Sequence, residues 1–311
     1  MKRFLTVLLL AGLCAGKGCA APALFTVQDI YDQAAGGWQE AWTAEGKDFA
    51  VDMEVSVPIA EALPVLWVTK AATETVLLSE GPYSGEEGAD QEFPRNVLPL
   101  ADACWDVPYA ENNPMTLAQA DALMAGQLAG LTGGKAEMML WEIVLLGRLR
   151  KTDAATGKFL EPLNDMGGYV LHYRQTLKGV PVLADAAGEC GIAATVFSAR
   201  EIRAVFSLYE EAAAVEEDAA LCSFDAVKNA VRTLVEQGVV ESTGSLALGY
   251  AVYMGTGDGD AGIAVPAWLL SGSKNRQAAG KSILISARTG EIMPWPDADG
   301  KAYPFPGIRA R

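Results

Sequence analysis

Hydrophobic and polar residues alternate in several short segments of the chain, with the period of two that a half-buried strand requires. The first such segment is FAVDMEVSV, residues 49–57, and Pro58 ends it. PVLWVTK, residues 64–70, predicts a second strand, and we expect a short helix from Thr73. The folded part of the chain is therefore predicted to begin near residue 49.

Alternation is clearest in residues 169–182, where tyrosine and leucine side chains share one face and His172 and Arg174 share the other. Lys178-Gly179 within this segment is typical of a tight hairpin turn. Further strands are predicted at 137–150, 192–198, 202–209, 246–254, 263–271 and 282–287. The first of these is apolar on both faces, so periodicity alone does not separate a strand from a helix, and we interpret it as a strand.

Two segments show the helical period of 3.6 residues between recognisable ends. Thr116 and Gln119 have capping-box spacing at the start of the first helix, and a glycine pair at 133–134 follows it. Ser223 caps the second helix, and Gly238 ends it. The predicted buried stripes are Leu117, Ala120, Met124, Leu128 and Leu131 in the first helix, and Val227, Val231, Leu234 and Val235 in the second.

A helix followed by strands thus occurs twice along the chain. This order predicts an α+β fold in which antiparallel sheets are each packed by a helix. Residues 81–114 and the acidic stretch 210–218 are rich in polar residues and are interpreted as surface loops. The predicted regions are a signal peptide at 1–23, a stalk or linker at 24–48, an N-terminal α+β region at 49–114, and two further units at 115–222 and 223–311.

The first 23 residues have the composition of an export signal, with a basic start, an apolar core too short to span a membrane, and small residues at the end. Cleavage is predicted after Ala23. A lipid anchor at Cys14 or Cys19 is the alternative, although neither cysteine follows a leucine and two small residues. With either outcome the mature chain is expected outside the cytoplasm, secreted or lipid-anchored at the cell surface.

The chain has 311 residues, of which 50% are hydrophobic, so it is long enough to bury a core. Its formal net charge is −15, and loss of the leader makes the charge more negative because Lys2, Arg3 and Lys17 leave with it. Such a surface repels phosphate groups and anionic membranes. Nucleic acid is therefore excluded as a partner, and contact with a membrane is expected only through a lipid anchor.

Three cysteines lie outside the leader, namely Cys104, Cys190 and Cys222. Their odd number and the lack of a C-x-x-C pair argue against a disulfide framework and against a zinc site. We interpret them as small buried hydrophobic residues. His172 is the single histidine of the sequence, and we expect it to be a packed or surface residue rather than a base. No cofactor is predicted.

Several fragments resemble enzyme motifs but lie in the wrong structural context. GDGDAG at 257–262 matches G-x-G-x-x-G, yet a strand follows it where a dinucleotide site needs a helix, so a hairpin loop is predicted. SGSK at 271–274 and NRQAAGKS at 275–282 also lack the helix that their chemistry requires. Asp258 and Asp260 are the metal-ligand candidates, although a calcium loop needs further carboxylates. No catalytic residue is predicted.

The segment 263–271 carries a proline and a tryptophan inside a predicted strand. Because Pro266 has no N–H to donate, it predicts a strand edge or a bulge at this point. Trp268 is predicted to cover the core on the side that faces a helix. Tyr250, Trp268 and His172 are the candidate residues for binding.

Three segments, LGYAVYM, IAVPAWLLSG and ILISARTGEI, resemble the C-terminal part of a family of uncharacterised exported proteins and lipoproteins of Gram-positive gut bacteria. That family is similar to PepSY-type domains and to Yyc-type extracytoplasmic regulators of a cell-wall sensor kinase. A strand followed by Thr289, Gly290 and Glu291 matches the PepSY-like signature, and YRQTLKGVPV resembles a hairpin of such modules. The resemblance covers residues 49–295 and implies two PepSY-like units in tandem, with no catalytic residues to transfer.

The sequence therefore favours a non-catalytic extracytoplasmic binding or regulatory protein of the cell envelope, whose expected partner is an envelope protein or peptide. The alternative is a cell-wall or polysaccharide hydrolase that uses paired carboxylates, because the chain is rich in acids whose separation in space is not visible in the sequence. A structural component of the envelope is the third hypothesis.

Overall fold

The computed structural model describes residues 24–79, 91–92, 95–98, 100–109, 115–134, 136–146, 150–151, 168–185, 188–189, 192–196, 201–255, 261–272 and 282–296. The predicted leader, with its cleavage and lipidation sites, lies outside these residues. Within them, every helix is too short or too polar to cross a membrane.

Strands dominate the secondary structure of the described ranges, which agrees with the predicted α+β class. The helices are α1 (Val27–Ala34), η1 (Leu100–Asp102), α2 (Leu117–Leu131) and α3 (Phe224–Glu236). The strands are β1 (Trp38–Ala44), β2 (Lys47–Ser56), β3 (Val65–Ser79), β4 (Gln91–Glu92), β5 (Arg95–Leu98), β6 (Glu137–Leu146), β7 (Arg150–Lys151), β8 (Gly168–Leu177), β9 (Val180–Asp185), β10 (Gly188–Glu189), β11 (Ile192–Val196), β12 (Glu201–Glu216), β13 (Thr243–Met254), β14 (Ala261–Gly272), β15 (Ile283–Ser286) and β16 (Ile292–Met293).

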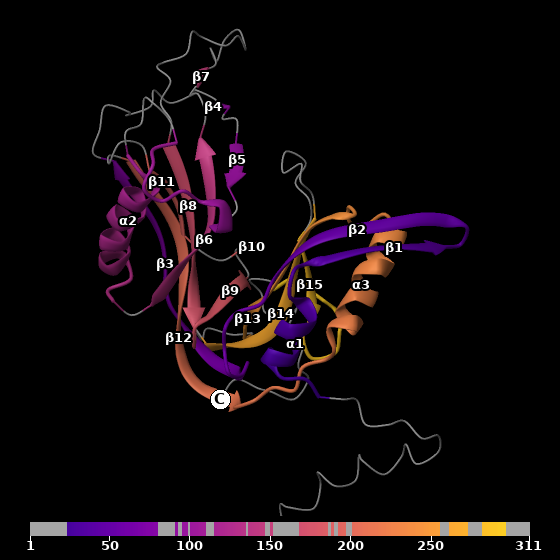
Figure 1. Cartoon of the computed structure of the whole chain (residues 1–311). Helices are drawn as coiled ribbons and strands as arrows, with labels where there is room; N and C mark the ends of the chain where they lie inside the picture. Colours follow the sequence, from indigo (N-terminus) through magenta and orange to yellow (C-terminus); the bar gives the residue numbers. More distant parts are fainter. Residues whose placement is uncertain are drawn as a thin grey trace, which may run out of the picture.

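Most of the described strands belong to one sheet with the order β12-β3-β14-β13-β9-β8-β6-β5. The β1–β2 hairpin joins this sheet at β13, and the β15–β16 pair joins it at β14. Strand β13 is parallel to β2 and to β9, whereas the other neighbouring pairs of described strands are antiparallel. Strands β3 and β12 pair along their whole lengths in opposite directions, and both extend between the part of the sheet beside α2 and the part beside α1 (Figure 1).

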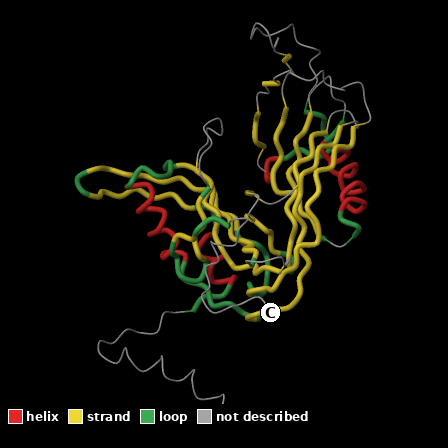
Figure 2. The backbone as a smooth tube through the Cα atoms, turned by 180° about the vertical axis from the view of Figure 1, so that it is seen from behind, coloured by secondary structure: helices red, strands yellow, loops and turns green. Residues whose placement is uncertain are grey.

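The helices flank two groups of strands (Figure 2). Helices α1 and α3 cover one face of β13 and β14, where the rings of Phe224 and Trp268 lie 5.4 Å apart. Helix α2 covers one face of β6 and β8. A third apolar cluster lies on the other face of β13 and β14, and Trp141 of β6 packs against it. This cluster joins the two groups of strands.

The two helices that were predicted from their capping residues are confirmed, together with those caps. Thr116 and Gln119 form a capping box at α2, and the hydroxyl of Ser223 accepts a hydrogen bond from the amide of Ala226 at α3. The predicted stripe of α3 is buried, and so are the first four residues of the predicted stripe of α2. The fifth, Leu131, has a side chain outside the described set.

The prediction of a stalk at 24–48 is wrong. Helix α1 begins after a capping box formed by Thr26 and Asp29, and it buries Ile30 in the core shared with α3. Strand β1 follows after two glycines, and β2 begins at Lys47, slightly before the predicted start of the fold. A short helix with one buried face can therefore look like a linker when its other face is acidic.

Two further predictions also fail because strands are longer than expected. The helix expected from Thr73 is absent, since β3 continues as a strand to Ser79. The acidic stretch 210–218 is not a loop throughout, since β12 continues to Glu216. The long connection expected at 81–114 contains β4, β5 and η1 within its described residues.

The hairpin at Lys178-Gly179 is confirmed, because both residues have positive φ, 52° and 75°, as a tight two-residue turn requires.

The position of Pro266 is also explained. On one side β14 pairs with β13 along its length, but on the other side it pairs with β3 up to Ala264 and with β15 from Ala267. Pro266 lies in the gap between these two partners, where the strand locally resembles an edge.

Candidate functional site

The structure places Tyr250 and Trp268 in the core beneath α3, as predicted for Trp268. Tyr250 is fully buried and lies opposite Pro266 on the neighbouring strand. Its hydroxyl has no hydrogen-bond partner among the described residues. Burial raises the pKa of Tyr250, and the charge of Glu211 raises it further. These two candidates are therefore packing residues rather than surface contacts.

His172 lies on a different part of the sheet and pairs with an acid. It is opposite Glu142 in the register of β8 and β6. The distance between Nδ1 of His172 and Oε2 of Glu142 is 3.3 Å, and the histidine side chain is 40% exposed. A partly exposed histidine is thus held in position by a carboxylate on the adjacent strand.

Arg174 continues the same face of β8 two residues farther along. Its Nη1 donates a hydrogen bond of 2.7 Å to the carbonyl oxygen of Leu183, and its guanidinium carbon lies 4.9 Å from the ring centroid of Trp141. Trp141 occupies an irregularity of β6 between Leu140 and Glu142. The extra residue at a β-bulge changes the direction of its side chain. We call Trp141, Glu142, His172 and Arg174 the β6–β8 cluster.

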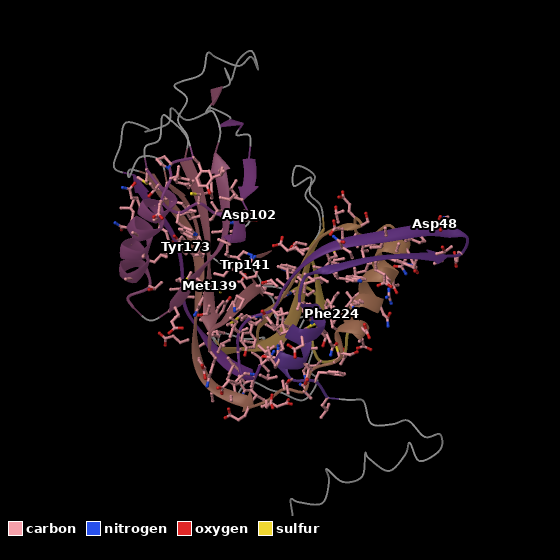
Figure 3. All side chains as sticks on the ribbon, in the orientation of Figure 1. Asp48, Asp102, Met139, Trp141, Tyr173 and Phe224 are labelled. Carbon is pink, nitrogen blue, oxygen red and sulfur yellow. The ribbon has the colours of Figure 1, made fainter. Side chains whose placement is uncertain are left out.

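The opposite face of β8 is fixed to α2. The hydroxyl of Tyr169 donates to the carbonyl oxygen of Met115 at 2.7 Å, and the hydroxyl of Tyr173 donates to Asp121 at 2.6 Å. Burial raises the pKa of Tyr173, and the bond to Asp121 raises it further. In Figure 3, Tyr173 lies towards α2 and Trp141 lies towards the β13–β14 part of the sheet. Strand β8 thus has one face that packs on α2 and one face that carries His172 and Arg174.

Buried polar side chains support the strands next to the cluster. The side-chain amide of Gln175 donates to the carbonyl oxygen of Tyr209 at 2.6 Å and accepts from its backbone N–H at 2.9 Å. The hydroxyl of Tyr209 donates to Asp185 at 2.6 Å. These bonds connect β8, β12 and β9, and all three side chains are buried. Satisfied buried polar networks rigidify the structure around them.

The chemistry of the β6–β8 cluster suits recognition. It combines the partly exposed imidazole of His172 with a carboxylate and with the indole of Trp141, which lies against the buried guanidinium of Arg174, and Trp is among the residues most enriched in binding hot spots. Within the described ranges, no group of three histidine, cysteine or acidic side chains is placed to hold a metal ion. The metal candidates Asp258 and Asp260 lie outside those ranges.

Sequence reasoning found His172 and the shared face of Arg174 but missed Trp141 and Glu142. Their strand, β6, is apolar on both faces, so no periodic signal showed which side chains lie next to His172. The bulge at Trp141 also leaves no mark in the sequence, because it depends on the register with β8. The missing information was the pairing of the strands.

The remaining predictions have mixed outcomes. Cys104 and Cys222 are free thiols, and Cys104 is exposed, which contradicts its interpretation as a buried hydrophobic residue. Burial raises the pKa of Cys222. Cys190 lies outside the described residues, as do most of the motif fragments at 257–262, 271–274 and 275–282.

Five chains of solved structures are similar to this chain. The chain is similar to an uncharacterized protein from Eubacterium rectale ATCC 33656 whose crystal structure was determined at 1.45 Å resolution. The sequence identity is 11% and the TM-score is 0.49, over 86% of this chain and 97% of that chain. No protein-family model and no curated protein matches the chain. The resemblance to PepSY-type domains therefore stays a prediction.

Proposed function

We propose that this chain is a non-catalytic extracytoplasmic binding or regulatory protein of the cell envelope, exported by the leader at 1–23. The observation that carries the proposal is the β6–β8 cluster, in which Arg174 stacks on Trp141 beside the Glu142–His172 pair. The partner is an envelope protein or peptide that presents carboxylate and aromatic groups to His172 and Trp141, whereas Arg174 is buried and holds Trp141 in place.

Two features of the cluster support binding over catalysis. The imidazole of His172 already contacts Glu142, and the guanidinium of Arg174 is fixed by a backbone carbonyl and an indole ring. Side chains held in place before binding lose little entropy when a partner arrives. The rigid support from α2 and from the buried polar network has the same effect.

The predicted tandem of PepSY-like units is part of this proposal. It is supported by α2 and α3, since each begins at a capped residue and packs against antiparallel strands that follow it in the chain. The units share their sheet, because β9 of the first pairs with β13 of the second. We therefore propose two related units that fold together and not two independent domains.

Affinity capture tests the binding function. The full mature chain is immobilised, exposed to envelope extract, and the retained proteins are quantified by mass spectrometry. We compare the wild type with Trp141→Ala and His172→Ala, and use Trp105→Ala as the control because Trp105 is also partly exposed but lies on the segment before α2. Near-UV circular dichroism verifies that each variant is folded.

The expected result is one partner that the wild type and the Trp105 variant retain and that both cluster variants lose by about tenfold or more. Equal capture by all four proteins, or capture of no specific protein, would overturn the proposal. Turnover of a cell-wall polymer that the wild type supports and Glu142→Gln abolishes would instead favour the paired-carboxylate hydrolase.

A further inference from the structure

The β1–β2 hairpin has a regular geometry that shows the direction of its backbone groups. The two strands pair over seven residues without a bulge, from Trp38 opposite Met53 to Ala44 opposite Lys47. The turn between them, Glu45-Gly46, has positive φ at both positions, 50° and 74°. This is the backbone of a type I′ turn, whose flanking residues exchange hydrogen bonds across the hairpin.

The flanking pair Ala44 and Lys47 is hydrogen-bonded, and from there hydrogen-bonded and non-hydrogen-bonded residue pairs alternate along the hairpin. Gln39, Ala41 and Thr43 therefore direct their N–H and C=O groups away from β2. An independent contact agrees, since the amide of Asp52, the residue opposite Gln39, donates to the carbonyl oxygen of Ser242 at 2.8 Å on the side away from β1. The outer edge of β1 is thus a row of three evenly spaced donor and acceptor pairs.

This edge is open among the described residues. There β1 pairs with β2 alone, and the backbone groups of Gln39, Ala41 and Thr43 that point outward make no hydrogen bond with them. Edge strands are usually protected by proline, lysine or a bulge, and β1, with the sequence WQEAWTA, has none of these. The hairpin extends beyond the rest of its part of the sheet (Figure 1), and Asp48 lies near its far end (Figure 3).

The exposed face of the hairpin is acidic. It carries the carboxylates of Asp48, Asp52 and Glu54, all exposed. Asp48 accepts a hydrogen bond of 2.8 Å from the hydroxyl of Thr43, and Asp52 accepts one of 3.2 Å from Gln39, so two acids lie beside the outer strand. The lysine of the hairpin, Lys47, alternates onto the opposite face.

The other face of the hairpin is aromatic and firmly attached. Trp42 stacks on Phe49 with 5.7 Å between ring centroids and donates from its indole nitrogen to Glu236 of α3 at 2.6 Å. Both carboxylate oxygens of Glu40 accept from Nη2 of Arg232, at 2.5 and 2.6 Å. Helix α3 therefore holds the hairpin in a fixed position, and its edge is ready to pair without rearrangement.

We propose that the open edge of β1 accepts an extended basic segment of a partner protein as an additional strand. Lysine or arginine at alternate positions of that segment reach over the small side chain of Ala41 to Asp48 and Asp52, and apolar residues between them pack beside Trp42. The proposal rests on the proposed binding function and names the chemistry of one partner. Strand addition supplies affinity through backbone bonds and specificity through alternate side chains.

A second copy of this chain is a poor occupant of the same edge. Pairing of β1 with another β1 brings two acidic hairpin faces side by side, and each chain carries a net charge of −15. Like charges on adjacent strands are destabilising. Charge complementarity thus favours a basic partner.

The test uses a dye-labelled nine-residue peptide in which lysine alternates with valine, with both termini blocked, and fluorescence anisotropy at low salt. Ala41→Pro removes the central outward N–H of β1 and leaves the bonds to β2 intact, since proline is tolerated where an edge amide points away from the sheet. Ala50→Pro is the matched control because Ala50, opposite Ala41, directs its amide to the other side of the hairpin. Circular dichroism verifies that both variants are folded.

We expect Ala41→Pro, and the double variant Asp48→Asn with Asp52→Asn, to weaken peptide binding by about tenfold or more, and Ala50→Pro to leave it unchanged. A peptide with N-methyl groups on alternate amides, and a peptide with glutamate in place of lysine, should not bind. Equal binding by the wild type and Ala41→Pro, or by the lysine and glutamate peptides, would overturn the proposal. A dimer in sedimentation that Ala41→Pro dissociates would show that a second copy occupies the edge and would also overturn it.

Failure here is distinguishable from failure of the proposed function. If peptide binding survives Trp141→Ala and is lost in Ala41→Pro, the peptide binds at the edge of β1 and does not need the β6–β8 cluster. Capture of an envelope partner that depends on Trp141 and not on Ala41 would keep the binding function and reject the edge.

Discussion

Tyr250 shows how much a single buried atom can matter. Its side chain fills the core beneath α3, yet its hydroxyl meets no acceptor among the described residues. A buried polar group without a partner costs about 1–3 kcal/mol, because water would have bonded to it in the unfolded chain. The ring stabilises the fold, and its oxygen opposes that contribution.

Replacement of this hydroxyl by hydrogen should stabilise the protein. We expect Tyr250→Phe to raise the free energy of unfolding by about 1–2 kcal/mol, as measured by urea denaturation, because the ring stays and the unsatisfied group is removed. Tyr173→Phe is the contrasting variant. It removes a hydroxyl that is bonded to Asp121, so it should lower the same free energy.

The effect of Tyr250 should also depend on pH. Burial raises its pKa above the ordinary value of 10.0. Above about pH 10 the unfolded chain loses the phenolic proton while the native state keeps it, so stability falls as the pH rises. The advantage of Tyr250→Phe over the wild type should therefore grow above about pH 10. An advantage that shrinks in this range would contradict the assignment of a buried neutral phenol.

The structural position of a single residue was predictable from the sequence where it depends on that residue's own chemistry or on its near neighbours in the chain. Pro266 marked a place without a backbone donor, and the structure puts it between two outer partner strands. Trp268 shared a face with small and apolar residues and lies against Phe224. Glu142 and Trp141 were not predictable, because their importance comes from a strand 30 residues away in the chain.

Strands and helices differ in how well their ends were predictable. The α2 and α3 termini follow from capping side chains, which act within one turn of the helix. The end of β12 depends on pairing with β3, so its acidic residues resembled a loop. The Thr26–Asp29 capping box was a visible sign of α1, and its misinterpretation as a stalk shows that a short helix is hidden by acidic surroundings.

The approach of β13 to β9 explains a glycine inside a strand. A Cβ atom at Gly249 would lie 2.4 Å from the carbonyl oxygen of Pro181 and 2.7 Å from Cγ of Leu183. Glycine in a strand interior often marks such a close approach. This position joins strands that the sequence assigned to two separate units.

Addition of one methyl group should therefore disturb this junction. We expect Gly249→Ala to lower the free energy of unfolding by about 1–3 kcal/mol, because the strands must move apart to admit it. Gly126→Ala is the matched control, since α2 has open space at that position and alanine favours helices by about 0.5–1 kcal/mol. Urea denaturation should show opposite signs for the two variants. A neutral Gly249→Ala would contradict the described packing of β13 on β9.

At the scale of the whole molecule, β3 and β12 connect the region of α2 with the region of α3. Each is a continuous strand that contributes to both groups of strands, and the third apolar cluster adds side-chain contacts between them. Neither group of strands can unfold separately unless the hydrogen bonds between β3 and β12 break partway along these strands. The sequence predicted two units but did not show that they share strands.

We therefore expect one cooperative unfolding transition. Far-UV circular dichroism and tryptophan fluorescence should give the same midpoint in urea, because the first reports on all strands while Trp268 reports on the core beneath α3 and Trp141 on the place where the two groups of strands meet. Two separated midpoints would show that the groups are independent and that the long strands break between them. A variant with the Gly249→Ala change should shift both signals together.

The place of β13 in the chain has a consequence for biosynthesis. This strand lies between β14 on one side and β2 and β9 on the other, yet it is made after more than two thirds of the polypeptide. Until a ribosome has produced residue 254, β2 and β9 lack the strand that connects them to the middle of the sheet. Long-range pairings of this kind form slowly, so we expect the middle of the sheet to form after the pairs β1–β2, β6–β8 and β3–β12, which lie earlier in the chain.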